Sequence, residues 1–483
     1  MGVRVWSLAT ALGLVFGAAA CTSEVVGTGD GEGTSGGARG TSGTSGAGGT
    51  YEEQPGTEAP AGPPPVITSV SPLEGDYGTE VTIQGDNFDG ATLVLGGGAE
   101  PLRFTMPAAD TESKPSNVIT EWSKTEIRFR YPFPADGSIR VTSPSGQAEG
   151  GTFVPTWRPG GGIAGELGRR QLLAVVSPAE GVLVAAFDGP VGPMIVVGGA
   201  DGTIRTQRFE RGSAALLTMS LYVTPEGRVD GFFSSGGTLW QLTDAAGAAT
   251  TSSTGVAAEH AAGGHDATGP YAWIKNGTTL ARVRPPAWDA DLTVQDPTPA
   301  GAPGQSIAVS PDHALVVGWG VNDGGYFPFY DHTTKAVARR LRPGSTTFDA
   351  SVTMGSGADD YMLWTRFFPG PDGRLGYYFC ANDTGLFSST TLDCRDGYLG
   401  GGAAPPSSSV MSSYVVGWNA TTAVVAGCEV ASATIKLGPE TQTAEQVKTI
   451  FPCPNVIAVA ADPTGAGHML VQSGKYLYAP RAR

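Results

Sequence analysis

The amino-acid sequence predicts an all-β protein in which a β-sandwich is followed by a seven-bladed β-propeller. Short alternating strands occupy residues 66–153, and turn signals recur at regular intervals from Trp157 to the end. Glycine accounts for 72 of the 483 residues, about twice its ordinary usage. No amphipathic helix of useful length is evident. Together these observations favour turn-dense β structure and a flexible segment.

The first twenty residues have the pattern of a secretory signal peptide. Arg4 precedes an apolar run from Val5 to Ala20 that is too short to be a reliable membrane span. The small residues before Cys21 resemble a bacterial lipobox, in which the cysteine thiol receives a diacylglycerol. This resemblance implies an exported protein, lipid-anchored at Cys21 to the outer membrane or cell surface. Ordinary cleavage after Ala20 is the alternative.

Residues 21–64 form a predicted disordered tether. The segment consists mainly of glycine, serine and threonine with scattered acids, and it lacks the apolar residues needed to offset the entropy of ordering. For about 40 flexible residues the root-mean-square reach is roughly 35 Å. The tether would therefore hold a folded body clear of a membrane surface.

Residues 65–155 form the predicted sandwich. Val66 to Val70 is rich in β-branched residues, and Thr79 to Gln84 alternates apolar and polar side chains. Leu93 to Leu95 begins another strand. Glu126 to Tyr131 places Ile127, Phe129 and Tyr131 on one face, and Ile139 to Thr142 completes the set. One side of these strands must be covered.

The run from Ile67 to Phe88 resembles the opening of an IPT/TIG domain, an immunoglobulin-like fold. The residues that carry the resemblance are Ile67 to Pro72, Gly75, Gly78-Thr79, Val81 to Ile83, Gly85 and Asn87-Phe88, with Thr125 to Ile127, Val141 to Pro144 and Gly146 later. A polar insertion between Arg103 and Glu121 departs from the family pattern. The resemblance brings no catalytic residues and implies a spacer or adhesion module.

The propeller prediction for residues 156–483 rests on a repeat of turns. Proline-led turns begin at residues 178, 225, 311, 371 and 463, with separations of 47, 86, 60 and 92 residues. These separations correspond to one, two, one and two periods of about 43 to 60 residues. Two further turns are expected near residues 268 and 417. A strand follows each turn, as in Val229 to Phe233, and a second turn and strand follow in most units, as in Gly236-Gly237 and Thr238 to Leu242. Residues between Thr156 and Arg170 are expected to complete the last unit.

Four cysteines beyond Cys21 are predicted to form disulfides. An even number of cysteines in an oxidising compartment favours two bridges, although four cysteines allow three connectivities. The pairs nearest in sequence are Cys380 with Cys394 and Cys428 with Cys453. A metal site is the alternative, but no C-x-x-C spacing supports it.

No catalytic residue, cofactor or metal site is predicted. His265-Asp266 belongs to the one local histidine cluster, for which a solvated loop is the favoured interpretation. Asp312-His313 and Asp331-His332 could orient imidazole rings, but neither pair makes a triad. Tryptophans recur along the repeat, and packing between blades is favoured over sugar stacking. The possible ligand-binding residues are Trp319, Trp418, His265 and Asp266.

The net charge of −15 disfavours nucleic acid and anionic lipid as partners. The sequence therefore predicts a non-catalytic envelope protein that binds a protein or polysaccharide through its propeller. Its membrane contact would be the N-terminal lipid. The alternatives are an extracellular propeller enzyme acting on carbohydrate and a structural scaffold without a specific ligand.

Overall fold

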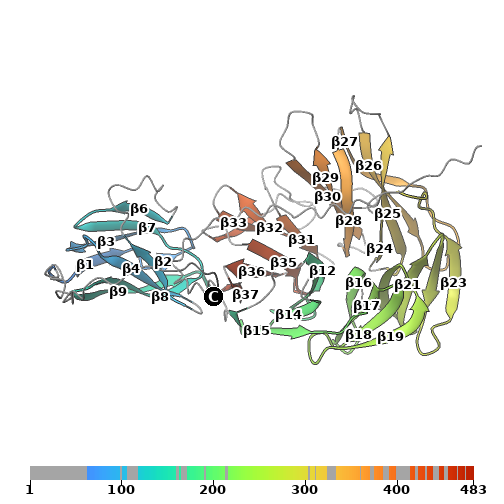
Figure 1. The fold of residues 1–483 in the computed structure, drawn as a ribbon, viewed down its shortest axis with the longest axis horizontal. Helices are drawn as coiled ribbons and strands as arrows, with labels where there is room; N and C mark the ends of the chain where they lie inside the picture. Colours follow the sequence, from blue (N-terminus) through green and yellow to red (C-terminus); the bar gives the residue numbers. More distant parts are fainter. Residues whose placement is uncertain are drawn as a thin grey trace, which may run out of the picture. The chain divides into compact units, whose positions relative to one another are not determined.

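The computed structural model contains only β-strands as regular elements within the residues that it describes (Figure 1). Those residues lie between 62 and 482, except for 98–99, 106–117, 159–162, 165–170, 190–191, 213–215, 303–304, 311, 324–332, 359, 370–374, 384–390, 399–413, 419–422, 430–431, 439–444, 451–454, 465 and 474. Over these ranges, no helix long and apolar enough to cross a membrane is found.

Two sheets form the sandwich. One has the order β1-β3-β7-β6, and the other has the order β2-β9-β8-β4-β5. The strands are β1 (Val66–Ser71), β2 (Glu74–Gly75), β3 (Glu80–Asp86), β4 (Thr92–Gly97), β5 (Leu102–Thr105), β6 (Ile119–Trp122), β7 (Glu126–Arg130), β8 (Ala135–Ser143) and β9 (Gly146–Pro155). The predicted strands are therefore confirmed. Most of the polar insertion after Arg103 lies outside the described residues.

The sandwich core is built from the alternating residues that the sequence indicates. Ile83, Ile127 and Phe129 are fully buried, because β3 and β7 pair with Ile83 opposite Ile127. Tyr131 stacks on Phe153, with ring centroids 3.9 Å apart. Aromatic side chains of this size bury the most apolar area per residue and dominate core energetics.

Within the described residues, the strands from β11 to β37 form seven successive small sheets. Six sheets have four strands and the sheet β28-β29-β30 has three. The strands of the first four are β12 (Gln171–Val176), β13 (Leu183–Asp188), β14 (Met194–Gly198), β15 (Ile204–Arg208); β16 (Leu216–Val223), β17 (Val229–Ser235), β18 (Thr238–Thr243), β19 (Thr250–Ala257); β20 (His260–Asp266), β21 (Gly269–Asn276), β22 (Thr279–Val283), β23 (Ala290–Gln295); and β24 (Ser306–Val309), β25 (Leu315–Asp323), β26 (Thr333–Leu341), β27 (Val352–Ala358).

The last three sheets follow the same order along the chain. Their strands are β28 (Asp360–Pro369), β29 (Leu375–Asp383), β30 (Thr391–Tyr398); β31 (Tyr414–Trp418), β32 (Ala423–Glu429), β33 (Ser432–Gly438), β34 (Glu445–Ile450); and β35 (Asn455–Ala461), β36 (Gly467–Ser473), β37 (Tyr476–Tyr478) with β11 (Ile163–Ala164). The turns expected at residues 178, 225, 268, 311, 371 and 463 fall between the first and second strands of a sheet, whereas Gly417, where the remaining turn was expected, lies within β31.

Neighbouring first strands lie side by side and close a ring. β12 contacts β16, β16 contacts β20, β20 contacts β24, and the series continues until β35 contacts β12 (Figure 1). The last sheet takes its outer strand from β11, which pairs with β37. The prediction that residues between Thr156 and Arg170 complete the last unit is therefore confirmed. A second pairing, β10 (Trp157–Arg158) with β38 (Arg481–Ala482), was not expected. This arrangement is a β-propeller.

Candidate functional site

The turns between first and second strands converge on one face of the propeller. The backbone N of Ala261 donates to Thr218 Oγ1, and the backbone N of Gly263 donates to Ser220 Oγ. Residue numbers increase together along β16 and β20, so these strands run in the same direction. The turn face is defined here by the first turns at residues 177–182, 224–228, 267–268, 310–314 and 462–466. Neighbouring first turns touch: Gly181 N donates to Asp462 Oδ2 at 3.2 Å.

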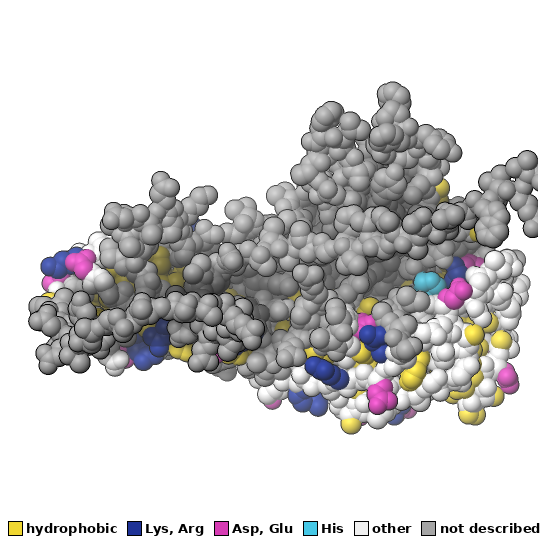
Figure 2. Space-filling model, viewed as in Figure 1, with side chains coloured by type: hydrophobic (Ala, Val, Ile, Leu, Met, Phe, Trp, Pro, Cys, Tyr) yellow, Lys and Arg dark blue, Asp and Glu magenta, His cyan; other side chains and the backbone are white. Residues whose placement is uncertain are grey.

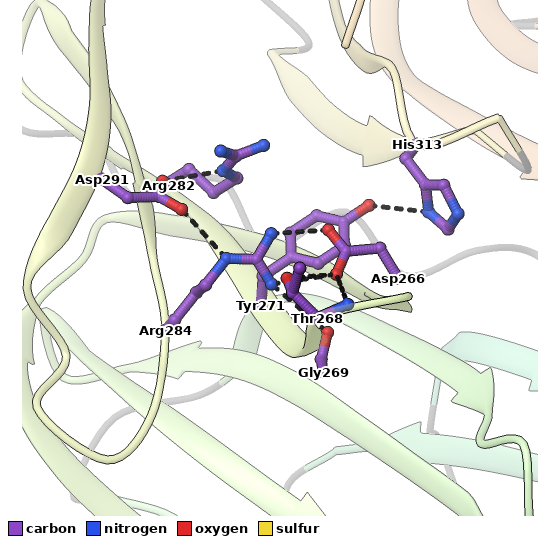
Figure 3. Close-up of polar contacts among 8 residues, drawn as sticks. All are labelled: Asp266, Thr268, Gly269, Tyr271, Arg282, Arg284, Asp291 and His313. Atoms are coloured by element: carbon purple, nitrogen blue, oxygen red, sulfur yellow. Dashed lines mark hydrogen bonds and ion pairs between the residues drawn. The ribbon is translucent and has the colours of Figure 1, made fainter. Parts of the chain in front are cut away.

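Asp266 lies at the centre of a polar cluster on this face (Figure 3). It ends β20, and its Oδ1 accepts hydrogen bonds from the backbone N and the hydroxyl of Thr268, at 2.8 and 2.7 Å. This closes the turn into β21. Both carboxylate oxygens also accept hydrogen bonds from the Arg284 guanidinium, at 2.5 and 3.1 Å, in a bidentate ion pair.

Arg284 links this turn to the outer strands of the same sheet. Its Nε donates to Asp291 Oδ2 at 2.9 Å, and Arg282 Nε donates to Asp291 Oδ1 at 2.7 Å. The guanidinium carbon lies 5.0 Å from the centre of the Tyr271 ring. Within this group two arginines face two aspartates, so their charges balance. Figure 2 likewise shows acidic and basic side chains beside a histidine on the visible surface.

Tyr271 connects this cluster to the fourth sheet. Its hydroxyl shares a hydrogen bond of 3.2 Å with Nδ1 of His313, which lies in the turn between β24 and β25. Burial raises the pKa of Tyr271 above its ordinary value, and the nearby charge of Asp266 raises it further. Tyr271 therefore stays protonated at neutral pH and is a hydrogen-bonding group rather than a base.

The Asp266 carboxylate is equally unsuited to proton transfer. Burial by itself would raise its pKa, but the hydrogen bonds from Arg284 and Thr268 outweigh burial and hold the pKa well below the usual range. A carboxylate with such a low pKa stays ionised and cannot act as a general acid near neutral pH. In this cluster Asp266 fixes the positions of Arg284 and the turn.

His265 precedes Asp266 but belongs to a different group of side chains. Its ring lies 6.4 Å from that of Tyr222 on β16, and the Tyr222 ring stacks at 5.7 Å on Phe232 of β17. The ring of Trp288 meets Phe232 edge-on at 6.0 Å. Tyr222 and Trp288 are half-buried at the margin of the apolar core between the second and third sheets. This set, Tyr222, Phe232, His265 and Trp288, is called the aromatic patch below.

The other predicted site residues do not join these clusters. Trp319 is 5% exposed and packs with Trp273 and Leu315 between the third and fourth sheets, in the way that the sequence favoured for the tryptophans. The backbone of Trp418 ends β31. Asp312 accepts from Ser310 Oγ at 2.5 Å and pairs with Arg340, so it does not orient His313. Asp331-His332 and Cys21 lie outside the described residues.

The cysteines are placed by their backbone alone. Cys380 on β29 and Cys394 on β30 are direct partners in the strand register. Cys428 lies on β32 opposite Ala433. Cys453 lies outside the described residues. Among the described residues, no three His, Cys, Asp or Glu side chains gather as a metal site.

Sequence reasoning missed Tyr222, Tyr271, Arg284 and Trp288. Tyr222 lies on β16 and Tyr271 on β21, whereas Arg284 and Trp288 share the connection between β22 and β23, so strand pairing and the neighbouring sheet bring them to one face. Trp288 carried a partial signal, because it follows Pro285-Pro286 and precedes Asp289, a run typical of a tight connection. The structure gives it a positive φ of 61°, which is uncommon for a tryptophan.

Residues 65–154 match the IPT/TIG domain family, and the sandwich is therefore an IPT/TIG domain. This match covers less than a fifth of the chain. No curated protein matches the sequence. The expected resemblance at residues 66–153 is thus confirmed.

Several solved structures share the all-β architecture at low identity. An auxiliary nutrient binding protein from Bacteroides ovatus is 12% identical, with 86% of this chain and 98% of that chain covered and a TM-score of 0.34. An ulvan lyase of a new polysaccharide lyase family is 10% identical, with 64% and 93% covered and a TM-score of 0.41. The propeller domain of the Trilobed protease from Pyrococcus furiosus is 11% identical, with 64% and 92% covered and a TM-score of 0.35. Likenesses this distant assign no function.

Proposed function

We propose that the protein is an exported lipoprotein of the bacterial cell envelope that binds a protein or polysaccharide through the turn face of its propeller. The IPT/TIG domain acts as a spacer between the lipid-bearing tether and the propeller. The observation that carries this proposal is the convergence of the Asp266 cluster and the aromatic patch on one face. Fixed aromatic and hydrogen-bonding groups at one surface are what a recognition site needs.

The electrostatics of the cluster support binding over catalysis. Asp266 remains ionised and Tyr271 remains protonated near neutral pH, as their shifted pKa values require. Neither is poised to exchange a proton with a substrate at that pH. Their contribution is to hold Arg284 and His313 in fixed positions.

Retention on envelope material tests the proposed function. Soluble protein beginning at Thr22 is incubated with envelope fractions, and both retained protein and released products are measured. We expect retention without turnover. The variant His313→Ala with Trp288→Ala should lose retention, whereas Thr250→Ala on an exposed outer strand should keep it. Retention that survives loss of both side chains would contradict a binding role for the turn face.

A second candidate is a carbohydrate-active enzyme, and the Tyr271 to His313 hydrogen bond favours it. Histidine is the side chain that most often serves as a general acid or base, and the Tyr271 hydroxyl holds the His313 ring in place. In that case envelope polysaccharide would be cleaved, and His313→Ala would abolish cleavage while retention persists. If the protein is neither retained nor releases products, a structural scaffold is the remaining function.

The lipid anchor is proposed on the sequence around Cys21. Labelled fatty acid should enter the wild-type protein in a bacterial host and should be absent from Cys21→Ala. Persistence of label in that variant would remove the anchor from the proposal. The binding role of the propeller does not depend on this result.

The disulfides are likewise proposed, with Cys380 and Cys394 as the better supported pair. Opposed residues on antiparallel strands have Cα atoms about 4.5 to 5.5 Å apart, within the range that a disulfide spans. The pairing of Cys428 with Cys453 rests on their proximity in sequence.

A further inference from the structure

His313 occupies a position at which corresponding turns of the propeller carry glycine. The turns at residues 224–228 and 310–314 have the same backbone hydrogen bonds: the fourth residue donates to the carbonyl of the first, and the first donates to the carbonyl of the fifth. His313 therefore corresponds to Gly227. The proline-led turns that begin at residues 371 and 463 also have glycine at this place in the sequence, as Gly373 and Gly465.

The backbone at this position has a left-handed conformation that favours glycine. The φ angle is 80° at Gly227 and 65° at His313. A residue with a Cβ atom is strained in this conformation, and residues strained in this way gather at functional sites. His313 is exposed, so packing in the core does not account for its imidazole ring. Glycine would satisfy the turn, which indicates that the imidazole has a role outside it.

Tyr271 fixes the orientation of this imidazole ring (Figure 3). Its hydroxyl lies 3.2 Å from His313 Nδ1, and the two rings meet edge-on with their centroids 6.0 Å apart. Burial raises the pKa of Tyr271, so the hydroxyl stays protonated at neutral pH and can donate a hydrogen bond to Nδ1. A neutral imidazole that accepts at Nδ1 carries its proton on Nε2.

We propose that His313 contacts the ligand of the turn face as a hydrogen-bond donor through Nε2, and that Tyr271 is the positioning residue that sets this tautomer. This inference rests on the proposed binding function and specifies the chemistry that the site recognises, which is an oxygen acceptor such as a hydroxyl or carbonyl group. An Nε2 atom that carries a proton has no free lone pair, so it neither takes a proton from the ligand nor binds a metal ion.

Nitrogen NMR tests the tautomer in the soluble chain from Thr22, with isotope-labelled histidine at about pH 8, where ordinary imidazole rings are neutral. The signals of His313 are identified by their loss in His313→Gln. We expect the proton on Nε2. In Tyr271→Phe, which keeps the ring and removes the hydroxyl, the form protonated on Nδ1 should become detectable. A proton on Nδ1 in the wild type, or the same tautomer signals in Tyr271→Phe, would overturn the assignment.

Retention on envelope fractions tests the contact with the ligand. His313→Gly installs the residue of the corresponding turn and should weaken retention about tenfold. It should not lower the midpoint of propeller unfolding, because water can reach the Tyr271 hydroxyl once the exposed ring is removed. His313→Gln supplies an amide N–H in place of the Nε2 donor and should lose less. Thr250→Ala, on an exposed outer strand, should be retained as the wild type is.

The inference and the proposed function fail in different ways. If the wild type is retained and His313→Gly is retained equally, His313 is not a ligand contact, and the proposed function then depends on the aromatic patch. A lowered unfolding midpoint in His313→Gly would show that the imidazole stabilises the turn instead, which also overturns the inference. Wild-type protein that is retained on no fraction would remove both the proposed binding function and the inference.

Discussion

The sandwich and the propeller use charged and aromatic side chains in opposite ways. In the sandwich, aromatic rings such as Tyr131 and Phe153 are fully buried, and the ion pair of Arg128 with Glu121 has side chains 44% and 51% exposed. On the turn face, Tyr222 and Trp288 are half-buried, and the Arg284 and Asp266 side chains are only 21% and 20% exposed.

This difference separates stability from recognition. An exposed ion pair contributes little because water screens both charges. A largely buried pair with two hydrogen bonds fixes the loops that carry it. The exposed pair of the sandwich therefore adds little to stability, whereas the largely buried pair of Arg284 with Asp266 fixes the first turn of the third sheet.

The largest expected effect on stability comes from removing one aromatic ring from the sandwich core. Phe129→Ala removes a fully buried ring and should lower the free energy of unfolding of the sandwich by about 4 kcal/mol. The propeller transition should stay in place. Calorimetry of the whole protein checks this. A loss shared equally by both transitions would show that the two domains do not unfold independently.

The next effect concerns the propeller alone. If Cys380 and Cys394 form a disulfide, reduction should lower the free energy of unfolding of the propeller by about 3 kcal/mol and leave the sandwich unchanged. Cys380→Ala should reproduce the effect without reductant. Free thiols at both positions in the unreduced, unfolded protein would rule the bridge out.

Replacing one arginine from each domain sharpens the comparison of their ion pairs. Arg284→Ala leaves Asp266 and Asp291 without their shared partner and should destabilise the propeller by about 2 to 3 kcal/mol. Arg128→Ala in the sandwich should cost less than about 0.5 kcal/mol. Denaturant titration measures both. Equal effects would contradict the contrast drawn between the two domains.

Asp462 links the last and first turns of the propeller and gives it an acid-sensitive contact. Burial would raise its pKa, but hydrogen bonds from Thr464 and His468 lower the pKa to about 2. Because the folded pKa lies below the ordinary value of 3.8, the contribution of Asp462, about 2 kcal/mol, is complete above pH 4 and is lost as the pH falls towards 2.

The pH dependence of unfolding tests this contact. Asp462→Asn should flatten the fall in propeller stability between pH 4 and pH 2. The sandwich, which lacks this contact, should serve as the internal reference. An unchanged pH profile in the variant would show that other carboxylates carry the acid sensitivity.

Local sequence patterns predicted the fold well because strand alternation and turn chemistry are local. The alternation of Phe129 and Tyr131 with charged residues is enough to predict a strand with one covered face. The turn expected near residue 268 lies between β20 and β21. The candidate site could not be predicted in this way. Arg284 meets Asp266 across 18 residues of one sheet, and Tyr271 meets His313 across 42 residues and two sheets, so these contacts depend on strand pairing and on the neighbouring sheet.

The burial of the tryptophans also could not be predicted from local sequence alone. Trp319 lies on a central strand between two sheets, whereas Trp288 lies in a connection at the edge of two sheets. Burial of each ring is decided by the neighbouring sheet. Periodicity can therefore predict a packed tryptophan but cannot identify the one that stays half-exposed.

The central claim, that the turn face carries recognition, is tested most directly by comparing retention on envelope fractions for two matched variants of the whole soluble protein. Trp288→Ala with His313→Ala alters the turn face, and Glu121→Ala with Arg128→Ala alters the surface of the sandwich. We predict that the first variant loses retention and the second keeps it. Retention lost in the sandwich variant and kept in the turn-face variant would contradict the account.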